Sequence, residues 1–258
     1  MKLRIVVSPD FGRERGIDWI LLSSLMRQRQ FNAELVTPAT VEQFDKMISE
    51  GEAEVVFANP VDALALVRGK GFVPFAKPTR IHDEMLISCA ASASIRTIMD
   101  LRVGSRIALK ADRCVEMVGM RLLEPAGSDS LNTHFIYCET SEGAADLVIT
   151  GSAEVAFFAT DSYSALSLAT RRSLRPLVKS AIGDLSHLLL CHPRLAGHAS
   201  VMQDAFVGLA AVDAEAASAM RVLGLELGFS SVTADAAEDM LDLVDALLDP
   251  SVGSIERL

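Results

Sequence analysis

A pattern of small, apolar and polar positions occurs twice in the chain, one hundred residues apart. The first copy begins at Gly51 and the second at Gly151, and Gly, Ala, Glu, Val and Phe recur at matching offsets. The likeness extends upstream, where Thr40 and Thr140 each begin an amphipathic stretch. Each copy predicts a short helix, a glycine that ends it, a buried strand and a polar turn.

The two copies predict two similar α/β lobes. In the first copy, Thr40 is a suitable N-cap, and the apolar face of the helix carries Phe44, Met47 and Ile48. Residues 55–58 are too short a run for a helix and too apolar for an edge strand, which favours a strand covered on both faces. We therefore expect each lobe to have a mostly parallel sheet flanked by helices.

The remaining apolar runs extend this prediction along the chain. Strands are expected at residues 3–7, 33–36, 72–76, 85–90, 106–109, 135–138 and 187–191, and helices at 17–30, 61–67 and 115–123. Beyond Pro193 the pattern predicts helices only, at 201–210, 214–223 and 236–248. This order assigns residues 1–89 and 187–258 to the first lobe and 90–186 to the second. Two crossovers between lobes are typical of a hinge that closes on a ligand.

Composition and net charge narrow the range of possible functions. A chain of 258 residues, half of them apolar, can bury a large core in one domain or two lobes. The net charge of −10 argues against a nucleic-acid partner, which would require a basic surface. A small anionic ligand remains compatible with it, because the local field of a pocket can oppose the net charge.

Motifs for cofactors and metals are missing. The chain has no P-loop, GxGxxG, GxSxG or HExxH motif, and its four cysteines form no CxxC pair, so we expect no cofactor and no metal site. Disulfides between them remain open. The N-terminus enters a strand at once, without a signal peptide or a run long enough to span a membrane. The chain as written is thus expected in the cytoplasm, or in the periplasm if a leader has been removed.

Several segments resemble one family. The strand ending in Ser8-Pro9-Asp10, the segment from Ile48 to Pro60, the Asp100-Leu-Arg-Val-Gly-Ser-Arg-Ile-Ala108 segment and the second repeat follow its order and spacing. The chain therefore resembles the phosphate/phosphite/phosphonate substrate-binding family, which has the type II periplasmic-binding-protein fold. The resemblance implies a non-catalytic protein that closes two lobes on a small polar, anionic ligand in the interlobe cleft and serves an ABC transporter permease.

The chain departs from this family at one point. The family usually binds its oxyanion at a helix start with the sequence Ser-Thr-Ser-Gly, where hydroxyl and backbone N–H groups converge. The corresponding positions here are Cys114-Val115-Glu116-Met117. This segment has no hydroxyl, and Glu116 would repel an anion if it pointed into the site.

Polar turns at the ends of the predicted strands supply the candidate ligand-binding residues. Ligands of such sheets bind beyond the carboxyl ends of the strands. The first lobe contributes two turns and the second lobe two, and their candidates are Ser8, Asp10, Asn59, Asp62, Asp112, Arg113, Cys114, Thr160, Asp161 and Tyr163. The alternative for each is ordinary turn chemistry, or, for Arg113, a solvated surface charge.

Two further functions are compatible with the same fold. The first is a cytoplasmic ligand sensor or adaptor of this fold that contacts a signalling partner. The second, less favoured, is a cytoplasmic enzyme such as a chorismate-dehydratase-like lyase, for which a buried cleft carboxylate with a raised pKa, for example Asp112 or Asp161, would be the sign. Cys114, at a helix start beside Arg113, has the setting of a reactive thiol, but no histidine lies near it in sequence. His187, His192 and His198 are at no metal-ligand spacing and are expected to be satisfied or exposed.

Overall fold

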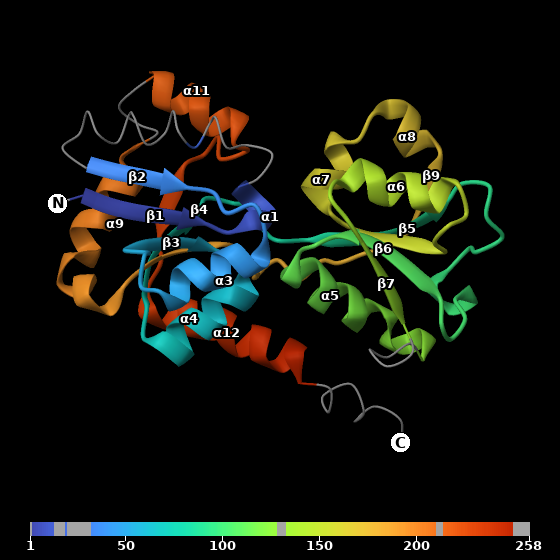
Figure 1. Cartoon of the computed structure of the whole chain (residues 1–258), viewed down its shortest axis with the longest axis horizontal. Helices are drawn as coiled ribbons and strands as arrows, with labels where there is room; N and C mark the ends of the chain where they lie inside the picture. The colour runs from blue at the N-terminus through green and yellow to red at the C-terminus, as the bar shows by residue number, and fades with distance from the viewer. Residues whose placement is uncertain (1, 13–18, 20–31, 128–132, 210–213, 250–258) are drawn as a thin grey trace. The chain divides into compact units, whose positions relative to one another are not determined.

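The computed structural model describes residues 2–12, 19, 32–127, 133–209 and 214–249. Its contacts divide the chain into two compact units (Figure 1). Unit 1 contains residues 1–82 and 186–244, and unit 2 contains residues 83–185 and 245–258. The helix expected at residues 17–30 lies outside the described residues, except for Trp19, whose side chain is buried.

The sheet of unit 1 has six strands in the order β11-β4-β10-β3-β1-β2. β1 is parallel to β2 and β3, whereas β10 is antiparallel to β3 and β4, and β11 is antiparallel to β4. All residues of β3 and β10 are buried, as expected for central strands covered on both faces. The strands are β1 (Lys2–Val7), β2 (Asn32–Val36), β3 (Val55–Ala58), β4 (Val73–Pro78), β10 (Leu188–Cys191) and β11 (Phe229–Ser231).

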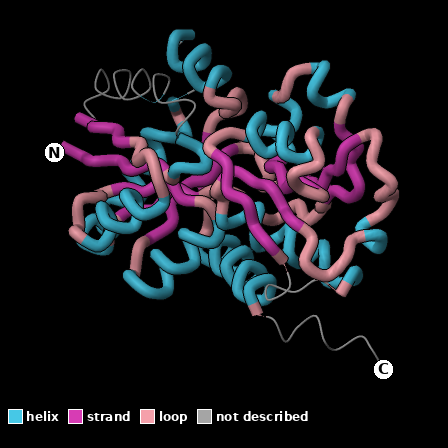
Figure 2. The backbone as a smooth tube through the Cα atoms, turned by 45° about the vertical axis from the view of Figure 1, so that its right-hand side comes forward, coloured by secondary structure: helices cyan, strands magenta, loops and turns pink. Residues whose placement is uncertain are grey.

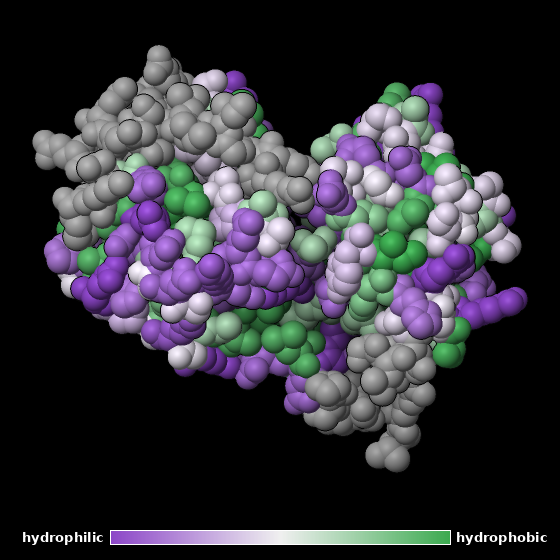
Figure 3. All heavy atoms as spheres, in the orientation of Figure 1, coloured by the Kyte–Doolittle hydropathy of each residue, from purple (hydrophilic) through white to green (hydrophobic). Residues whose placement is uncertain are grey.

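Helices pack on this sheet through alternate strand residues. Leu3, Ile5 and Val7 share one face of β1 and belong to the same core as Met202 and Phe206. Helix α3 is amphipathic: Phe44 and Ile48 are buried, and its outer face is hydrophilic (Figure 3). The helices of unit 1 are α1 (Pro9–Gly12), α3 (Val41–Ser49), α4 (Pro60–Lys70), η4 (Pro193–His198), α9 (Ala199–Val207), α11 (Ala214–Val222) and α12 (Ala234–Leu248).

The sheet of unit 2 has five strands in the order β7-β6-β8-β5-β9. β6 is parallel to β7 and β8, whereas β5 is antiparallel to β8 and β9. The strands are β5 (Met85–Ala90), β6 (Arg106–Lys110), β7 (His134–Cys138), β8 (Val155–Ala159) and β9 (Leu174–Lys179). The helices are η2 (Ile98–Asp100), α5 (Arg113–Leu123), η3 (Glu124–Ala126), α6 (Ser141–Ile149), α7 (Thr160–Ala165) and α8 (Leu168–Arg172).

Helices cover both faces of this second sheet, with α6 and α7 on one side and α5 on the other (Figures 1 and 2). Gly119 allows α5 to approach the sheet closely, because a methyl group at this position would overlap the Phe157 ring of β8. On the opposite face, Ala144, Ala145 and Val148 of α6 pack in one apolar cluster. Small residues on the helices thus bring both layers close to the strands.

The sequence repeat corresponds to a repeated structure. The order β2-β1-β3-β10-β4 in unit 1 has the same strand directions as β7-β6-β8-β5-β9 in unit 2. Thr40 and Thr140 both accept a hydrogen bond from the backbone N–H three residues later, at 3.2 and 3.1 Å. Gly51 and Gly151 end the two helices with φ of 72° and 78°. The prediction of two similar α/β lobes is confirmed.

The structure corrects several details of the sequence prediction. The sheets are mixed rather than mostly parallel, because β10 and β5, which each follow a crossing between the units, run antiparallel to their neighbours. The proposed boundary at residue 89 is wrong: the chain crosses at residues 82–83, ahead of β5, and crosses back at 185–186. Residues from 245 onward also group with unit 2 rather than with the first lobe.

Two strands were not predicted at all. In β9, Pro176 and charged residues interrupt the apolar positions. The sequence of β9 therefore lacks the pattern of a buried strand. β11 has three residues within a region that was expected to be entirely helical. Both strands lie at sheet edges, where burial imposes the weakest pattern on the sequence.

Candidate functional site

Four predicted residues of unit 1 meet in one buried network at the carboxyl ends of β1 and β3. Asn59 follows β3 and caps α4, since its side-chain oxygen accepts the backbone N–H of Asp62 at 2.9 Å. Its amide nitrogen donates to Asp62 Oδ2 at 2.9 Å and to Ser8 Oγ at 3.3 Å. Ser8 follows β1, and its hydroxyl donates to Asp10. Because β1 and β3 are parallel neighbours, their ends bring these side chains together.

Asp10 also pairs with a residue that sequence analysis left outside the site. His187, immediately before β10, lies with Nε2 3.1 Å from Asp10 Oδ2, and both side chains are almost fully buried. The rings of Phe11 and Phe57 each lie 5.1 Å from the imidazole. Burial raises the pKa of Asp10, but the charge and hydrogen bond of His187, with the Ser8 hydroxyl, outweigh it and leave the pKa below its usual value.

This arrangement differs from a nucleophilic triad. Asp10 lies between the Ser8 hydroxyl and the His187 ring, whereas an activated serine needs the imidazole beside its hydroxyl. The lowered pKa also keeps Asp10 ionised, so it is not a neutral acid that could donate a proton. The network fixes the carboxyl ends of β1 and β3, and within it the charge of Asp10 is paired with His187. The expectation that His187 is satisfied is confirmed.

In unit 2, the turn after β6 is organised by Asp112. Its carboxylate accepts the backbone N–H of Val115 at 3.0 Å and so caps α5. Cys114 is buried in the first turn of this helix, and Arg113 is half-buried. Asp112 therefore places an acidic side chain at this helix start. The ligand-binding role predicted for Cys114 stays a prediction.

Glu116, one turn into α5, is engaged by an aromatic residue of β7. The Tyr137 hydroxyl donates to Glu116 Oε2 at 3.0 Å, while more than half of the tyrosine surface remains exposed. Burial, together with the hydrogen bond and the charge of Glu116, raises the pKa of Tyr137 to about 12. Glu116 is therefore held by a hydrogen bond on the surface of the unit.

The turn after β8 places three predicted residues on α7. The Thr160 hydroxyl oxygen is buried and has no hydrogen-bond partner within the described structure. Asp161 is exposed. Tyr163 turns back onto the sheet, with its ring 5.7 Å from that of Phe158. Burial raises the pKa of Tyr163, an effect that the charge of Arg171 and the hydroxyl of Ser88 oppose.

The two turns of unit 2 share one edge of its sheet, because β6 and β8 are parallel. Asp112 and Thr160 therefore follow neighbouring strands, as Ser8 and Asn59 do in unit 1. The sequence identified these four positions and missed His187. The only signal for His187 was its place at the start of a predicted strand that returns to the first unit.

The part of the chain that the structure describes shows no metal site, no disulfide and no membrane-spanning helix. Among the residues that the structure describes, no group of three or more His, Cys, Asp or Glu side chains has the arrangement of a metal site. All four cysteines lie in the described part of the chain and form no disulfide. No described helix combines the length and apolar character needed to cross a bilayer.

Solved structures of known proteins share this fold. XAC2383 from Xanthomonas citri bound to ATP has a TM-score of 0.73 and 13% identity, with 95% of this chain and 98% of that chain covered. A binding protein component of an ABC phosphonate transporter from Pseudomonas aeruginosa has a TM-score of 0.73 and 13% identity, over 98% and 92%. PhnD1 from Prochlorococcus marinus in complex with methylphosphonate has a TM-score of 0.74 and 9% identity, over 95% and 98%. At these identities the likeness establishes the fold alone.

The family follows from a comparison of the sequence with family models. The search of curated proteins gave no match. The model described as "ABC transporter, phosphonate, periplasmic substrate-binding protein" matches residues 20–237, which include both repeats and most of both units. The chain therefore belongs to the family of periplasmic substrate-binding proteins of phosphonate ABC transporters.

Proposed function

We propose that this protein binds a small anionic solute of the phosphonate or sulfonate class without transforming it, and delivers it to a transporter permease. The observation that carries the proposal is the family match over residues 20–237. Structures of similar fold include one in complex with methylphosphonate and an aliphatic sulphonate binding protein from Escherichia coli. The ligands named for these two proteins are tetrahedral oxyanions with an organic substituent, which is the ligand chemistry we infer here.

The turns after β6 and β8 of unit 2, and those after β1 and β3 of unit 1, carry the candidate ligand-binding groups. Thr160 is the strongest candidate among them, because its buried hydroxyl has no hydrogen-bond partner in the described structure. Buried polar groups almost always have a partner, so a ligand oxygen at this position would satisfy it. Asp112 already caps α5, which favours a ligand that also offers a hydrogen-bond donor, such as a singly protonated phosphonate.

A non-catalytic role agrees with the state of the buried carboxylate. The pKa of the buried Asp10 carboxyl is lowered by its contacts with His187 and Ser8, so this group is no proton-donating acid near neutral pH. The description of the family places its members in the periplasm and beside an ABC transporter. A permease is therefore the partner that we propose, in preference to a signalling protein.

A thermal-shift screen with calorimetry tests the ligand class. Purified protein is measured with methylphosphonate, phosphate, sulfate, ethanesulfonate, acetate and glycine. A ligand at a hundred times its Kd stabilises the folded protein by about 2.7 kcal/mol, so a specific ligand gives a clear rise in Tm. We expect a response confined to phosphonates or sulfonates. Stabilisation by acetate and glycine alone would contradict the proposed class.

Two variants test the role of Thr160. Thr160→Val keeps the shape of the side chain and removes the hydroxyl, so it should weaken binding by about tenfold while leaving Tm without ligand almost unchanged. Ser164→Ala is the matched control, because the Ser164 hydroxyl lies on the same helix and is bonded to the Thr160 carbonyl at 2.9 Å. Equal affinities of the two variants would remove Thr160 from the site.

A further inference from the structure

A pocket of about 490 Å³ lies at the amino ends of β6 and β8 in unit 2. Ser105 directly precedes β6 and Glu154 directly precedes β8, whereas Asp112 and Thr160 follow the same two strands. The pocket is therefore at the edge of the sheet opposite to the proposed solute site. Its lining residues are Ser94, Ile95, Asp100, Leu101, Arg102, Gly104, Ser105 and Glu154.

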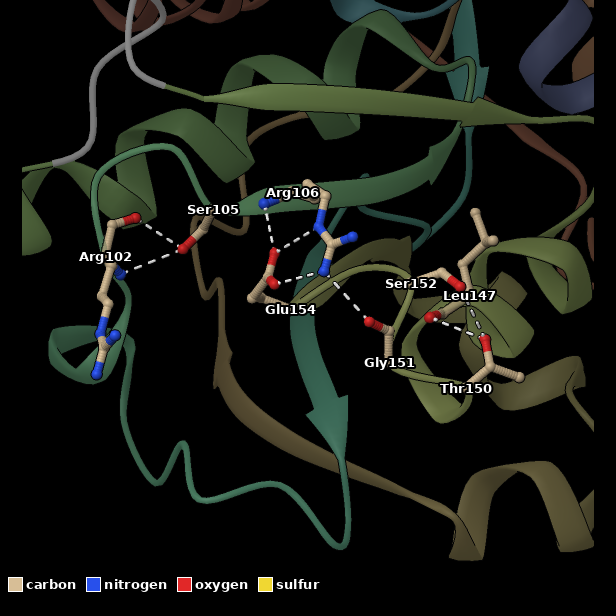
Figure 4. Close-up of polar contacts among 8 residues, drawn as sticks. All are labelled: Arg102, Ser105, Arg106, Leu147, Thr150, Gly151, Ser152 and Glu154. Atoms are coloured by element: carbon tan, nitrogen blue, oxygen red, sulfur yellow. Dashed lines mark hydrogen bonds and ion pairs between the residues drawn. The ribbon is translucent and has the colours of Figure 1, made fainter.

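One wall of the pocket is fixed by an ion pair. Arg106 Nη2 lies 2.8 Å from Glu154 Oε1 and 3.2 Å from the Gly151 carbonyl oxygen, and the backbone N–H of Arg106 donates to Glu154 Oε2 at 2.6 Å (Figure 4). The same figure shows the Ser105 hydroxyl bonded to the backbone of Arg102 on both sides, at 3.2 and 2.7 Å. These contacts leave the wall with a defined shape before any ligand binds.

Another part of the lining is held by Arg175 of β9. Its guanidinium donates to the carbonyl oxygens of Ala91, Ala93 and Ile95, at 2.9, 2.8 and 2.5 Å. This loop carries Ser94 and Ile95 into the pocket lining. A loop fixed by three hydrogen bonds loses little freedom on binding, so the pocket is preorganised.

The charged groups of the lining differ in whether they are already engaged. Glu154 is bound by Arg106, and Asp100 accepts the backbone N–H groups of Arg96 and Thr97 at 2.8 and 2.9 Å. These backbone hydrogen bonds lower the pKa of Asp100. In contrast, the guanidinium of Arg102 makes no hydrogen bond or ion pair within the described residues, and Figure 4 shows it directed away from Ser105 and Glu154.

We propose that this pocket is a second ligand site, which takes a small organic monoanion with its acidic group on Arg102 and a short apolar body against Ile95 and Leu101. The pocket volume falls within the range of about 300–1,000 Å³ that is typical of small-molecule sites. The planar guanidinium binds a carboxylate or sulfonate through two parallel hydrogen bonds. The Ser94 hydroxyl, which also has no partner in the described structure, is a further donor.

The charges around the pocket limit the ligand to one negative charge. The cations Arg102 and Arg106 are matched in formal charge by Asp100 and Glu154. One anionic group of the ligand can pair with Arg102. A second anionic group would have no cation to pair with and would be repelled by Asp100 and Glu154. An ammonium group would have to share carboxylates that already accept hydrogen bonds and would face the charge of Arg102, so cations of the same size should bind poorly.

Methyl NMR of the whole protein tests the site directly. Labelled Ile and Leu methyl groups report on Ile95 and Leu101 during titrations with hexanoate, hexylammonium and 1-hexanol. We expect hexanoate to shift both signals and the other two compounds to have little effect. Binding at the proposed solute site would move signals elsewhere, so failure of either proposal is recognised independently of the other.

Variants assign the effect to Arg102. Arg102→Gln should weaken hexanoate binding by about tenfold or more, because it removes a charge-assisted pair. Arg172→Gln is the matched control, since Arg172 is an exposed arginine of the same unit outside the pocket lining. The proposal is overturned if hexanoate leaves Ile95 and Leu101 unchanged at millimolar concentration, if Arg102→Gln binds as tightly as Arg172→Gln, or if hexylammonium produces the same shifts.

Discussion

Glu154 forms two hydrogen bonds with the backbone of Arg106, the first residue of the neighbouring strand β6. One uses the side chain of Glu154 and the other its backbone. Its carboxylate accepts the backbone N–H of Arg106 at 2.6 Å, and its own backbone N–H donates to the Arg106 carbonyl at 3.0 Å. Glu54 makes the same pair of bonds with Arg4, at 2.8 and 3.0 Å. The glutamate that recurs in the sequence repeat therefore sets the register of two parallel strands in each unit.

Removing this carboxylate should destabilise the fold modestly. Glu154→Ala leaves the backbone N–H of Arg106 without its acceptor, and we expect the free energy of unfolding to fall by about 1 kcal/mol, because the site is partly exposed to water. Urea denaturation measures the change. Glu139→Ala, at an exposed position, should stay within about 0.5 kcal/mol of the wild type. Equal effects of the two variants would contradict the role given to Glu154.

The buried pair of Asp10 and His187 should have a larger effect. Asp10→Asn removes the charge that faces His187 and replaces one of the two acceptor oxygens by an amide donor, so the free energy of unfolding should fall by about 3 kcal/mol. Asp161→Asn, at an exposed aspartate, is the control. A double-mutant cycle with His187→Gln measures the coupling between the two residues. Additive effects would show that the pair contributes nothing beyond its separate side chains.

The same pair predicts how stability depends on pH. The pKa of Asp10 is lowered in the folded state, so its contribution is fully present above the ordinary value of 3.8 and is lost as pH falls through the folded pKa. The difference in unfolding free energy between wild type and Asp10→Asn should thus be constant above about pH 5 and should shrink as the pH falls towards about pH 3. A difference that is constant over this range would argue against a lowered pKa.

The two tyrosines of the chain give a spectroscopic test. Phenolate absorbance should show no tyrosine ionising at the ordinary pKa near 10, because the pKa of Tyr163 is raised and that of Tyr137 lies at about 12. Glu116→Gln removes the charge beside Tyr137 and should lower its pKa, although burial keeps it above the ordinary value. Glu142→Gln, on an exposed position of α6, should leave the titration unchanged.

Gly119 and Gly69 should respond in opposite ways to alanine. A helix interior normally gains about 1 kcal/mol from this change. At Gly119, the added methyl group would overlap the Phe157 ring, so Gly119→Ala should destabilise the protein by about 1–3 kcal/mol. At Gly69 the space is open, and Gly69→Ala should be neutral or stabilising. Thermal unfolding of both variants checks the contrast, and a stable Gly119→Ala protein would refute the close packing of α5.

Sequence patterns predicted those features of the fold that arise from local chemistry or strong burial. The threonine caps, the glycine stops and the buried central strands all belong to this class. The edge strands β9 and β11 lacked such a pattern because they are partly exposed or very short. Strand β5 was found, but its unit was not, since only its pairing with β8 and β9 reveals which sheet it joins.

The candidate site was predictable to the same extent. The turns were found because they follow strands, and parallel pairing then brings Ser8 and Asn59 together. The partner of Asp10 was missed because His187 lies 177 residues away in the sequence. The direction of Tyr163 depends on α7, a six-residue helix with no side-chain cap, whose orientation is set by packing on Phe158 rather than by its own sequence.

The interrupted order of unit 1 has a consequence for biosynthesis. Its central strand β10 pairs with β3 and β4, yet it is translated after the whole of residues 83–185. All five strands of unit 2 come from that one continuous segment. On a ribosome, where domains fold as their residues emerge, the inserted unit can complete its sheet while β3 still has an open edge. Nascent chains that stall between β9 and β10 would therefore carry one finished unit and an exposed apolar strand, which makes this interval the one most in need of chaperone protection.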